Sequence, residues 1–216
     1  MKPVKNGMGK EKSFFISFLS ILLIAAGLFM AASYSYQWAR GYLAVEQIEV
    51  EEADASLMKD KAVAKPMQTP QYESPPETGE QFGKLTIPKL EVSIPIFEGT
   101  DPDQLAKGIG HFSNSVLPGE DNNSVLSGHR DTVFRRLGEV GEDDLLIVTT
   151  SAGEFTYRVQ KVRIVDADDR TVIVPKPRAT LTVTTCYPFN FIGNAPERYV
   201  LVAELIGTKL TEAKTT

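Results

Sequence analysis

One uncharged run near the N-terminus constrains this chain more than any other feature. The run extends from Phe14 to Ala32, and the segment before it contains Lys2, Lys5, Lys10 and Lys12. As a helix it would be about 28 Å long, close to the hydrocarbon thickness of a bilayer. Lysines precede the run and none follows it directly, which predicts a cytoplasmic N-terminus (residues 1–13) and an exported remainder. We expect an uncleaved signal anchor over residues 14–32 rather than a cleaved signal peptide, whose apolar core is usually shorter.

Residues 33–81 are interpreted as an extracellular stalk and linker rather than a folded domain. The acidic part, 40–64, carries scattered apolar residues that are only partly periodic, which is compatible with a helical stalk. The part that follows is polar and contains Pro66, Pro70, Pro75, Pro76 and Gly79. This composition is typical of an extended spacer. The globular part is therefore expected to begin at Phe82.

Short β runs separated by turn residues fill the chain after Phe82. Polar and apolar residues alternate over 83–87 and 92–97, as in half-buried strands. Further apolar or β-branched runs lie at 124–129, 145–150, 154–165, 172–174, 180–186 and 198–206. About eight short strands with one or two short helices predict a mainly β fold, a closed or nearly closed β-barrel over residues 82–207. The polar residues 208–216 are expected to form a flexible tail.

Composition excludes several functions for this barrel. The formal net charge is −5, and no basic patch interleaved with aromatic residues suggests binding to nucleic acid. The single cysteine excludes an intramolecular disulfide. The sequence also has no Gly-rich phosphate loop and no paired-Cys metal spacing. A domain outside the cell must then be stabilised by its core, and its thiol must be hidden or have another role.

Three chemically distinct side chains are predicted at strand ends. Cys186 ends the β-branched run from Thr180 and precedes Tyr187-Pro188, while His129 follows the strand that ends in Ser127-Gly128. Arg198 begins the last strand. Nucleophilic thiol chemistry needs a base or cation beside the sulfur and donors aimed at the developing oxyanion. The alternatives are a buried structural cysteine and a surface ion pair for the arginine. The second histidine, His111, lies between apolar residues and is expected to have a structural role.

Three segments around these residues resemble the signature segments of sortases. They are Ser-Gly-His-Arg at 127–130, Thr-Val-Thr-Thr-Cys at 182–186 and Glu-Arg-Tyr-Val at 197–200. The continuation from Cys186 to Phe189 and the run from Gly128 to Phe134 are similar to the class D branch of the family. The resemblance covers residues 82–206. One departure is Val183, where the family usually has Leu, and it affects only packing.

The resemblance implies an eight-stranded sortase-type barrel and a cysteine transpeptidase. By this match Cys186 is the nucleophile, His129 the acid and base, and Arg198 the stabiliser of the oxyanion and substrate. It also implies that Thr185 contacts the substrate, that the loops 166–177 and 187–197 line the cleft, and that Phe189 and Ile192 bind or pack there. The substrate would be a secreted protein with an LPxTG-like C-terminal signal, and the acceptor an amine of a peptidoglycan precursor.

No cofactor is expected for this chemistry. Calcium is the alternative to consider, because some sortases bind it between acidic loops, and the candidates here are Glu120, Asp121, Asp166, Asp168 and Asp169. Their spacing matches no defined calcium loop, so solvated acidic loops are preferred. L,D-transpeptidases are the less favoured enzyme class, since their His and Cys usually lie close together in one segment. The alternative outside catalysis is a membrane-tethered β-domain that only binds a cell-wall or protein partner.

Overall fold

The computed structural model describes residues 8–47, 72–191, 193 and 195–211, with side chains from Phe15 onward. The chain divides into two compact units between Ala39 and Arg40. The first seven residues, most of the predicted linker (48–71) and the end of the predicted tail (212–216) lie outside the described residues.

The predicted anchor lies within one continuous helix, α1 (Met8–Leu43). From Phe15 to Leu43 this helix is long and apolar enough to cross a membrane. Large apolar side chains such as Ile21, Leu28 and Phe29 are more than half exposed on it. A helix surface that is apolar on every side is stable in hydrocarbon rather than in water. Helix α1 therefore fits a single-pass membrane anchor, and it continues beyond the predicted end at Ala32.

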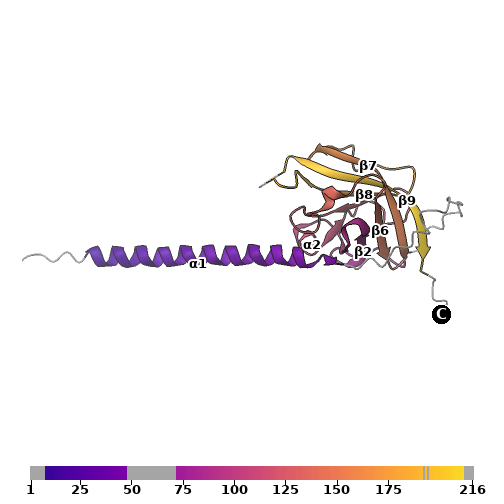
Figure 1. Ribbon diagram of the computed structural model, residues 1–216. Helices are drawn as coiled ribbons and strands as arrows, with labels where there is room; N and C mark the ends of the chain where they lie inside the picture. Colours follow the sequence, from indigo (N-terminus) through magenta and orange to yellow (C-terminus); the bar gives the residue numbers. More distant parts are fainter. Residues whose placement is uncertain (1–7, 48–71, 192, 194, 212–216) are drawn as a thin grey trace, which may run out of the picture. The chain divides into compact units, whose positions relative to one another are not determined.

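The second unit is a closed β-barrel (Figure 1). Its first strands are β2 (Gln81–Ile87), β3 (Val92–Glu98), β4 (Ile109–His111) and β5 (Asn123–Ser127). The remaining strands are β6 (Leu145–Thr150), β7 (Gly153–Asp166), β8 (Thr180–Tyr187) and β9 (Glu197–Leu210). Their order is β3-β2-β6-β7-β9-β8-β5-β4, and the parallel pairing of β3 with β4 closes the sheet. The predicted eight-stranded, mainly β barrel is thus confirmed.

Alternating side chains of these strands fill the barrel. Leu85 of β2 lies opposite Ile94 of β3, and both side chains are fully buried. Leu146 and Val148 of β6 and Phe155 and Tyr157 of β7 are buried in the same core. Burying each such side chain contributes roughly 1.5–3 kcal/mol. The core is therefore built by the period-two pattern that predicted the strands.

Helical segments in the barrel unit are short. They are η2 (Pro88–Leu90), α2 (Pro102–Leu105) and η3 (Leu137–Glu139). Helix α2 begins after Asp101 with proline at its first position, where proline is favoured because it needs no backbone N–H there. The 3-10 turn η3 follows a run of turns that begins just after His129, so the chain leaves β5 without regular structure.

Three segments differ from the sequence prediction. Strand β4 was not predicted, since it has only three residues, including Gly110, and shows no alternation. Strand β9 extends to Leu210, beyond the predicted domain end at 207, because β7 is long enough to pair with it down to Gly153. Residues 172–174 form no strand although Val172 is buried.

Residues before the barrel also contact it. The two-residue strand β1 (Glu46–Gln47) pairs with Ser93 and Val92 of β3. Val45 and Tyr72 are partly buried against the barrel core. The Tyr72 hydroxyl donates to the carbonyl of Pro118 at 2.7 Å. Parts of the predicted stalk and linker are therefore packed on the globular unit.

Candidate active site

Three neighbouring strands carry the residues that the sequence singled out. Strand β8 lies between β5, to which it is parallel, and β9, to which it is antiparallel. The β5–β8 register pairs Ser127 with Thr184, and the β8–β9 register pairs Cys186 with Arg198. The strands meet at one end of the barrel, so their terminal residues lie at the same level.

The thiol and the guanidinium share one face of the sheet. Residues directly opposite each other in antiparallel strands point to the same side, which places Cys186 beside Arg198. Both side chains are half-buried, so both are partly accessible to a substrate. Among the described residues Arg198 forms no ion pair, and its Nη1 donates to the carbonyls of Ala195 (3.2 Å) and Glu197 (2.8 Å). Its remaining N–H groups have no partner in the described part of the chain, which leaves them for an oxyanion.

The turn that carries His129 follows β5, on the opposite side of β8 from Arg198. His129 is two residues beyond Ser127, and Cys186 is two residues beyond its partner Thr184, so continuing the parallel register brings them level. Two hydrogen bonds extend this register past the end of β5. The Gly128 N–H donates to the Thr184 carbonyl at 3.2 Å, and the Thr185 hydroxyl donates to the Gly128 carbonyl at 2.7 Å. The turn that carries the exposed His129 is thereby fixed to β8 next to the cysteine.

Thr185 occupies the opposite face of β8 from Cys186. Side chains alternate along a strand, and Thr185 is only 3% exposed while its hydroxyl is bound by Gly128. The residue on the same face as the thiol is the half-buried Thr184, which the sequence analysis did not single out. The alternation of side chains along a strand would have indicated that residues 184 and 186 share a face. Direct contact between Thr185 and a substrate stays a prediction.

The chain after Cys186 forms an aromatic cluster. The ring of Phe189 makes edge contacts with Tyr187 and Tyr199, at centroid distances of 5.7 and 5.3 Å. It also covers Gly138, where an added Cβ would lie 2.7 Å from the ring. Phe189 is thus packed against the segment that follows His129, and its contact with substrate stays a prediction. Ile192 lies outside the described residues.

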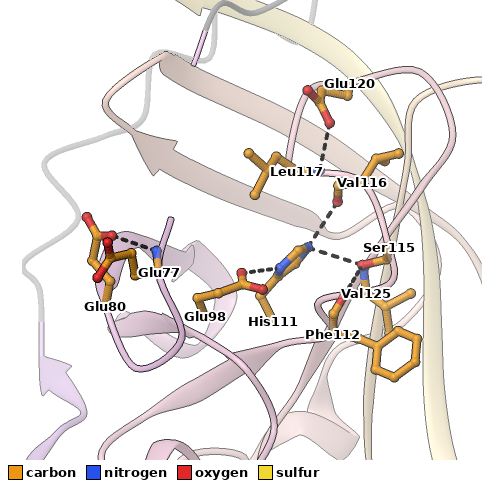
Figure 2. A network of polar contacts seen from close by, with 10 residues as sticks. All are labelled: Glu77, Glu80, Glu98, His111, Phe112, Ser115, Val116, Leu117, Glu120 and Val125. Carbon is orange, nitrogen blue, oxygen red and sulfur yellow. Dashed lines mark hydrogen bonds and ion pairs between the residues drawn. The ribbon is translucent and has the colours of Figure 1, made fainter. Parts of the chain in front are cut away.

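His111 belongs to a separate, buried network (Figure 2). It lies opposite Glu98 in the β3–β4 pair, and its Nδ1 is 2.6 Å from a carboxylate oxygen of Glu98. Its Nε2 faces the carbonyl of Val116 at 3.0 Å and the hydroxyl of Ser115 at 3.1 Å. Since a carbonyl can only accept, Nε2 carries a hydrogen, and the other proton is shared with Glu98. The ring is therefore held between strands and loop by both nitrogens.

Carboxylates in the acidic loops accept hydrogen bonds from other groups of the protein. Asp169 accepts from the Thr171 N–H at 2.7 Å and from Arg163 at 3.3 Å. The hydrogen bonds from Thr171 and the nearby Arg163 lower its pKa. A carboxylate oxygen of Glu120 accepts from the Leu117 N–H at 2.9 Å. Within the described ranges no group of three or more His, Cys, Asp or Glu side chains could hold a metal ion.

The arrangement of the three strand ends defines a class of enzyme. Thiol-dependent acyl transfer needs a sulfur nucleophile, a proton carrier and an oxyanion stabiliser. This end of the barrel presents one of each, the thiol and the guanidinium on paired strand ends and the imidazole on the turn after β5. The class is a cysteine acyl transferase.

Comparison with known proteins identifies the family. The Sortase domain family model matches residues 85–206, more than half of the chain. The chain is 41% identical over 193 residues to Sortase D of Bacillus subtilis (strain 168), covering 87% of this chain and 98% of that protein. This chain belongs to the sortase family, whose members are cysteine transpeptidases.

Solved structures agree with this assignment. The catalytic domain of B. anthracis SrtD is 43% identical with a TM-score of 0.56, covering 65% of this chain and 97% of that one. A Clostridium perfringens Sortase D5 transpeptidase is 30% identical with a TM-score of 0.57, covering 62% of this chain and 83% of that one. Both matches carry the D designation, as does the Bacillus subtilis relative, in accord with the class D resemblance.

Proposed function

We propose that this sortase cleaves an LPxTG-like C-terminal sorting signal through an acyl-thioester on Cys186. It then transfers the acyl group to an amine of a peptidoglycan precursor. The observation that supports this proposal is the position of Cys186 on β8, opposite Arg198 of β9 and near the turn after β5 that contains His129.

Each residue has a defined role in the two half-reactions. The Cys186 thiolate attacks the carbonyl of the scissile peptide bond, and Arg198 donates hydrogen bonds to the oxyanion that forms. Protonated His129 gives its proton to the leaving amine, and the C–N bond breaks to leave the thioester. The incoming amine attacks the thioester, its proton passes to His129, and the sulfur leaves as thiolate. Cys186 is then again a thiolate and His129 is again protonated, as at the start.

The proposed setting is the outer face of a cell membrane. The lysines before α1 favour a cytoplasmic N-terminus, so that the barrel lies outside the cell with the secreted substrates. The loops on either side of β8, residues 166–177 and 187–197, are the proposed walls of the peptide cleft. Thr185, Phe189 and Ile192 are the proposed substrate-binding residues in or beside these walls.

We also propose that the reaction needs no cofactor. Thiolate, imidazole and guanidinium supply the nucleophile, the proton carrier and the oxyanion donors. Asp169, one of the calcium candidates, is already bound to Arg163 and Thr171. Treatment with EDTA is expected to leave the transfer rate unchanged, and added calcium is expected not to raise it. A several-fold loss on chelation that calcium restores would contradict this.

The test uses the full chain in detergent micelles with a panel of LPxTG-like peptides and a small amine. Mass spectrometry is expected to find an acyl adduct on Cys186 that the amine converts into a capped product. Cys186→Ala should give no adduct, and His129→Ala should slow transfer by roughly 10²–10⁴-fold, as for other lost acid–base groups. A folded chain with an alkylatable thiol and no adduct from any peptide would favour the binding-domain alternative.

A further inference from the structure

Arg130 is a buried cation directly beside the proposed proton carrier. It is 5% exposed, whereas its neighbour His129 is exposed. Its ion-pair partner, Asp131, has a side chain that is 66% exposed, and the Nε–Oδ1 distance is 3.3 Å. A charge this deeply buried requires better partners than one solvated carboxylate.

Those partners are three carbonyls of the loop that follows the nucleophile. Nη1 donates to the Pro188 carbonyl at 2.9 Å. Nη2 donates to the carbonyls of Phe191 and Gly193, the latter at 3.0 Å. The guanidinium carbon also lies 5.9 Å from the centre of the Phe191 ring. One side chain thus binds the first half of the β8–β9 loop, residues 188–193, at three points.

The backbone of this loop segment makes few hydrogen bonds of its own. Among its described residues the backbone forms one hydrogen bond within the segment, from the Phe191 N–H to the Pro188 carbonyl at 3.3 Å. Hydrogen bonds from a charged donor contribute about 1.5–3 kcal/mol each, more than one long backbone bond. Arg130 therefore supplies the main polar contacts between the segment and the rest of the barrel, in addition to the packing of the Phe189 ring on Tyr199.

We propose that Arg130 is a positioning residue that holds segment 188–193 against the His129 turn and so sets the geometry of the peptide cleft. The arginine is covalently next to His129, and the segment begins two residues after Cys186, so the tie joins the two sides of the reaction centre. It also holds Phe191, a residue that is 43% exposed, in the loop proposed to line the cleft. This role rests on the proposed function. It predicts an effect on peptide capture and acylation, with the thiol–imidazole pair left intact.

The test compares Arg130→Met and Arg130→Lys with Arg136→Met in the full chain in detergent. Arg136 is the matched control, because its side chain is 54% exposed and pairs with an exposed carboxylate of Glu139. Hydrogen exchange of the Phe191 amide, which donates within the segment, should accelerate at least about tenfold in Arg130→Met and stay unchanged in the control. The value of kcat/KM for the sorting peptide should fall roughly 10²-fold, mainly through KM, as for a misplaced binding wall.

Alkylation of Cys186 separates positioning from a general structural defect. The rate of alkylation should stay within about twofold of wild type in both Arg130 variants, and its dependence on pH should not shift. The reason is that Cys186 and His129 keep their positions. Arg130→Lys keeps the charge but cannot reach three carbonyls, so it should fold like wild type and recover only part of the loss.

Two outcomes would overturn the role of Arg130. One is a folded, active Arg130→Lys chain with unchanged loop exchange and unchanged KM. The other is an alkylation profile that shifts as much as peptide turnover falls, which would place the effect on the thiol–imidazole pair. A wild-type chain that transfers no peptide would instead overturn the proposed function, and the cleft role with it, independently of the loop exchange.

Discussion

A single hydroxyl connects the nucleophile strand to the imidazole turn. Thr185 precedes Cys186, is buried, and donates to the carbonyl of Gly128, the residue before His129. This bond crosses from β8 to the chain just past β5, where the parallel ladder has ended. The residue before the thiol therefore acts on the position of the imidazole.

Thr185→Val is expected to lower both stability and turnover. The variant keeps the shape but leaves the Gly128 carbonyl without its donor, which costs about 1–3 kcal/mol. The freed turn should lower kcat/KM for the sorting peptide by roughly 10–10²-fold, since small misplacements of catalytic groups are costly. Thr185→Ser, which retains the hydroxyl, should stay close to wild type. Equal activity of the Val and wild-type chains in the peptide assay would contradict this.

His111→Ala is expected to affect folding rather than chemistry. The variant leaves the buried Glu98 carboxylate without its partner, and loss of one member of such a pair costs about 3–5 kcal/mol. Thermal unfolding should show the loss, whereas adduct formation on Cys186 below the unfolding temperature should persist. If a folded His111→Ala chain formed no adduct, the choice of His129 as proton carrier would be wrong.

Residue types and strand-end positions were enough to select Cys186, His129 and Arg198 from the sequence. The structure pairs Cys186 with Arg198 and fixes the turn that contains His129 to β8, and the catalytic roles of the three stay predictions. Arg130 could not be assigned a role in this way. Its partners are backbone carbonyls, whose positions depend on the course of a loop. Every residue has a carbonyl, so the residue types do not indicate which ones an arginine binds.

At the scale of elements, the turn after β5 depends on close packing of glycine. A Cβ on Gly128 would lie 2.6 Å from the ring of Phe134 and 2.8 Å from Val133, both of which are buried. The backbone before His129 can therefore approach the core only because residue 128 has no side chain.

Gly128→Ala is expected to move this turn and reduce transfer. The overlap with Phe134 must be relieved by shifting the turn, so a loss of roughly 10²-fold in kcat/KM is expected for a chain that still folds. Gly141→Ala is the matched control, since nothing lies within 4 Å of a Cβ at that position. Kinetics of the two purified variants with one peptide give the comparison. Similar rates for both would show that the turn tolerates the displacement.

Elements with a clear apolar or β-branched run were predicted well from the sequence. The strand expected at 145–150 has the bounds of β6, and the hairpin at 151–153 joins β6 to β7. Strand β4 was missed because its three residues are all buried and give no period-two signal. The length of β9 was underestimated because it is decided by the partner strand β7, which the local sequence of β9 does not reveal.

At the scale of the whole molecule, two tyrosine hydroxyls hold the 112–120 loop on the barrel by hydrogen bonds. The buried Tyr157 hydroxyl accepts from the Gly119 N–H at 2.6 Å, and Tyr72 donates to the Pro118 carbonyl. Burial raises the pKa of both phenols. The folded state therefore favours the neutral phenols, and this contribution to stability is complete only below their ordinary pKa of about 10.

Alkaline pH is expected to unfold the barrel by ionising these phenols. Ionisation of the tyrosines should not affect the free energy of unfolding below pH ~10. Above that pH it should lower the free energy of unfolding by about 1.4 kcal/mol per pH unit for each group. Tyr157→Phe should be less stable at pH 8, since the Gly119 N–H loses its acceptor, but its stability should decline less steeply above pH ~10. Urea unfolding between pH 8 and 11 measures both. An equal alkaline slope in the two chains would exclude Tyr157 as a source.

The membrane anchor and the barrel class could be predicted from hydropathy and strand count, but the strand order could not. Neighbours in the sheet such as β5 and β8 are separated by two other strands in the sequence. Alternation shows that a strand has a buried face and does not show which strand lies beside it. The resemblance to sortases implied the type of barrel and the number of its strands.

The order of the strands also bears on when the thiol becomes competent during synthesis. Ribosomes make the chain from the N-terminus, and the pairings of β8 with β5 and β9 join segments that are far apart in sequence. Such non-local pairings form late, because the intervening chain must first be closed into a loop. Cys186 meets its guanidinium only when β9 has been made and paired. We therefore expect a nascent or truncated chain that lacks β9 to carry Cys186 without its neighbouring guanidinium, and so without the proposed oxyanion donor.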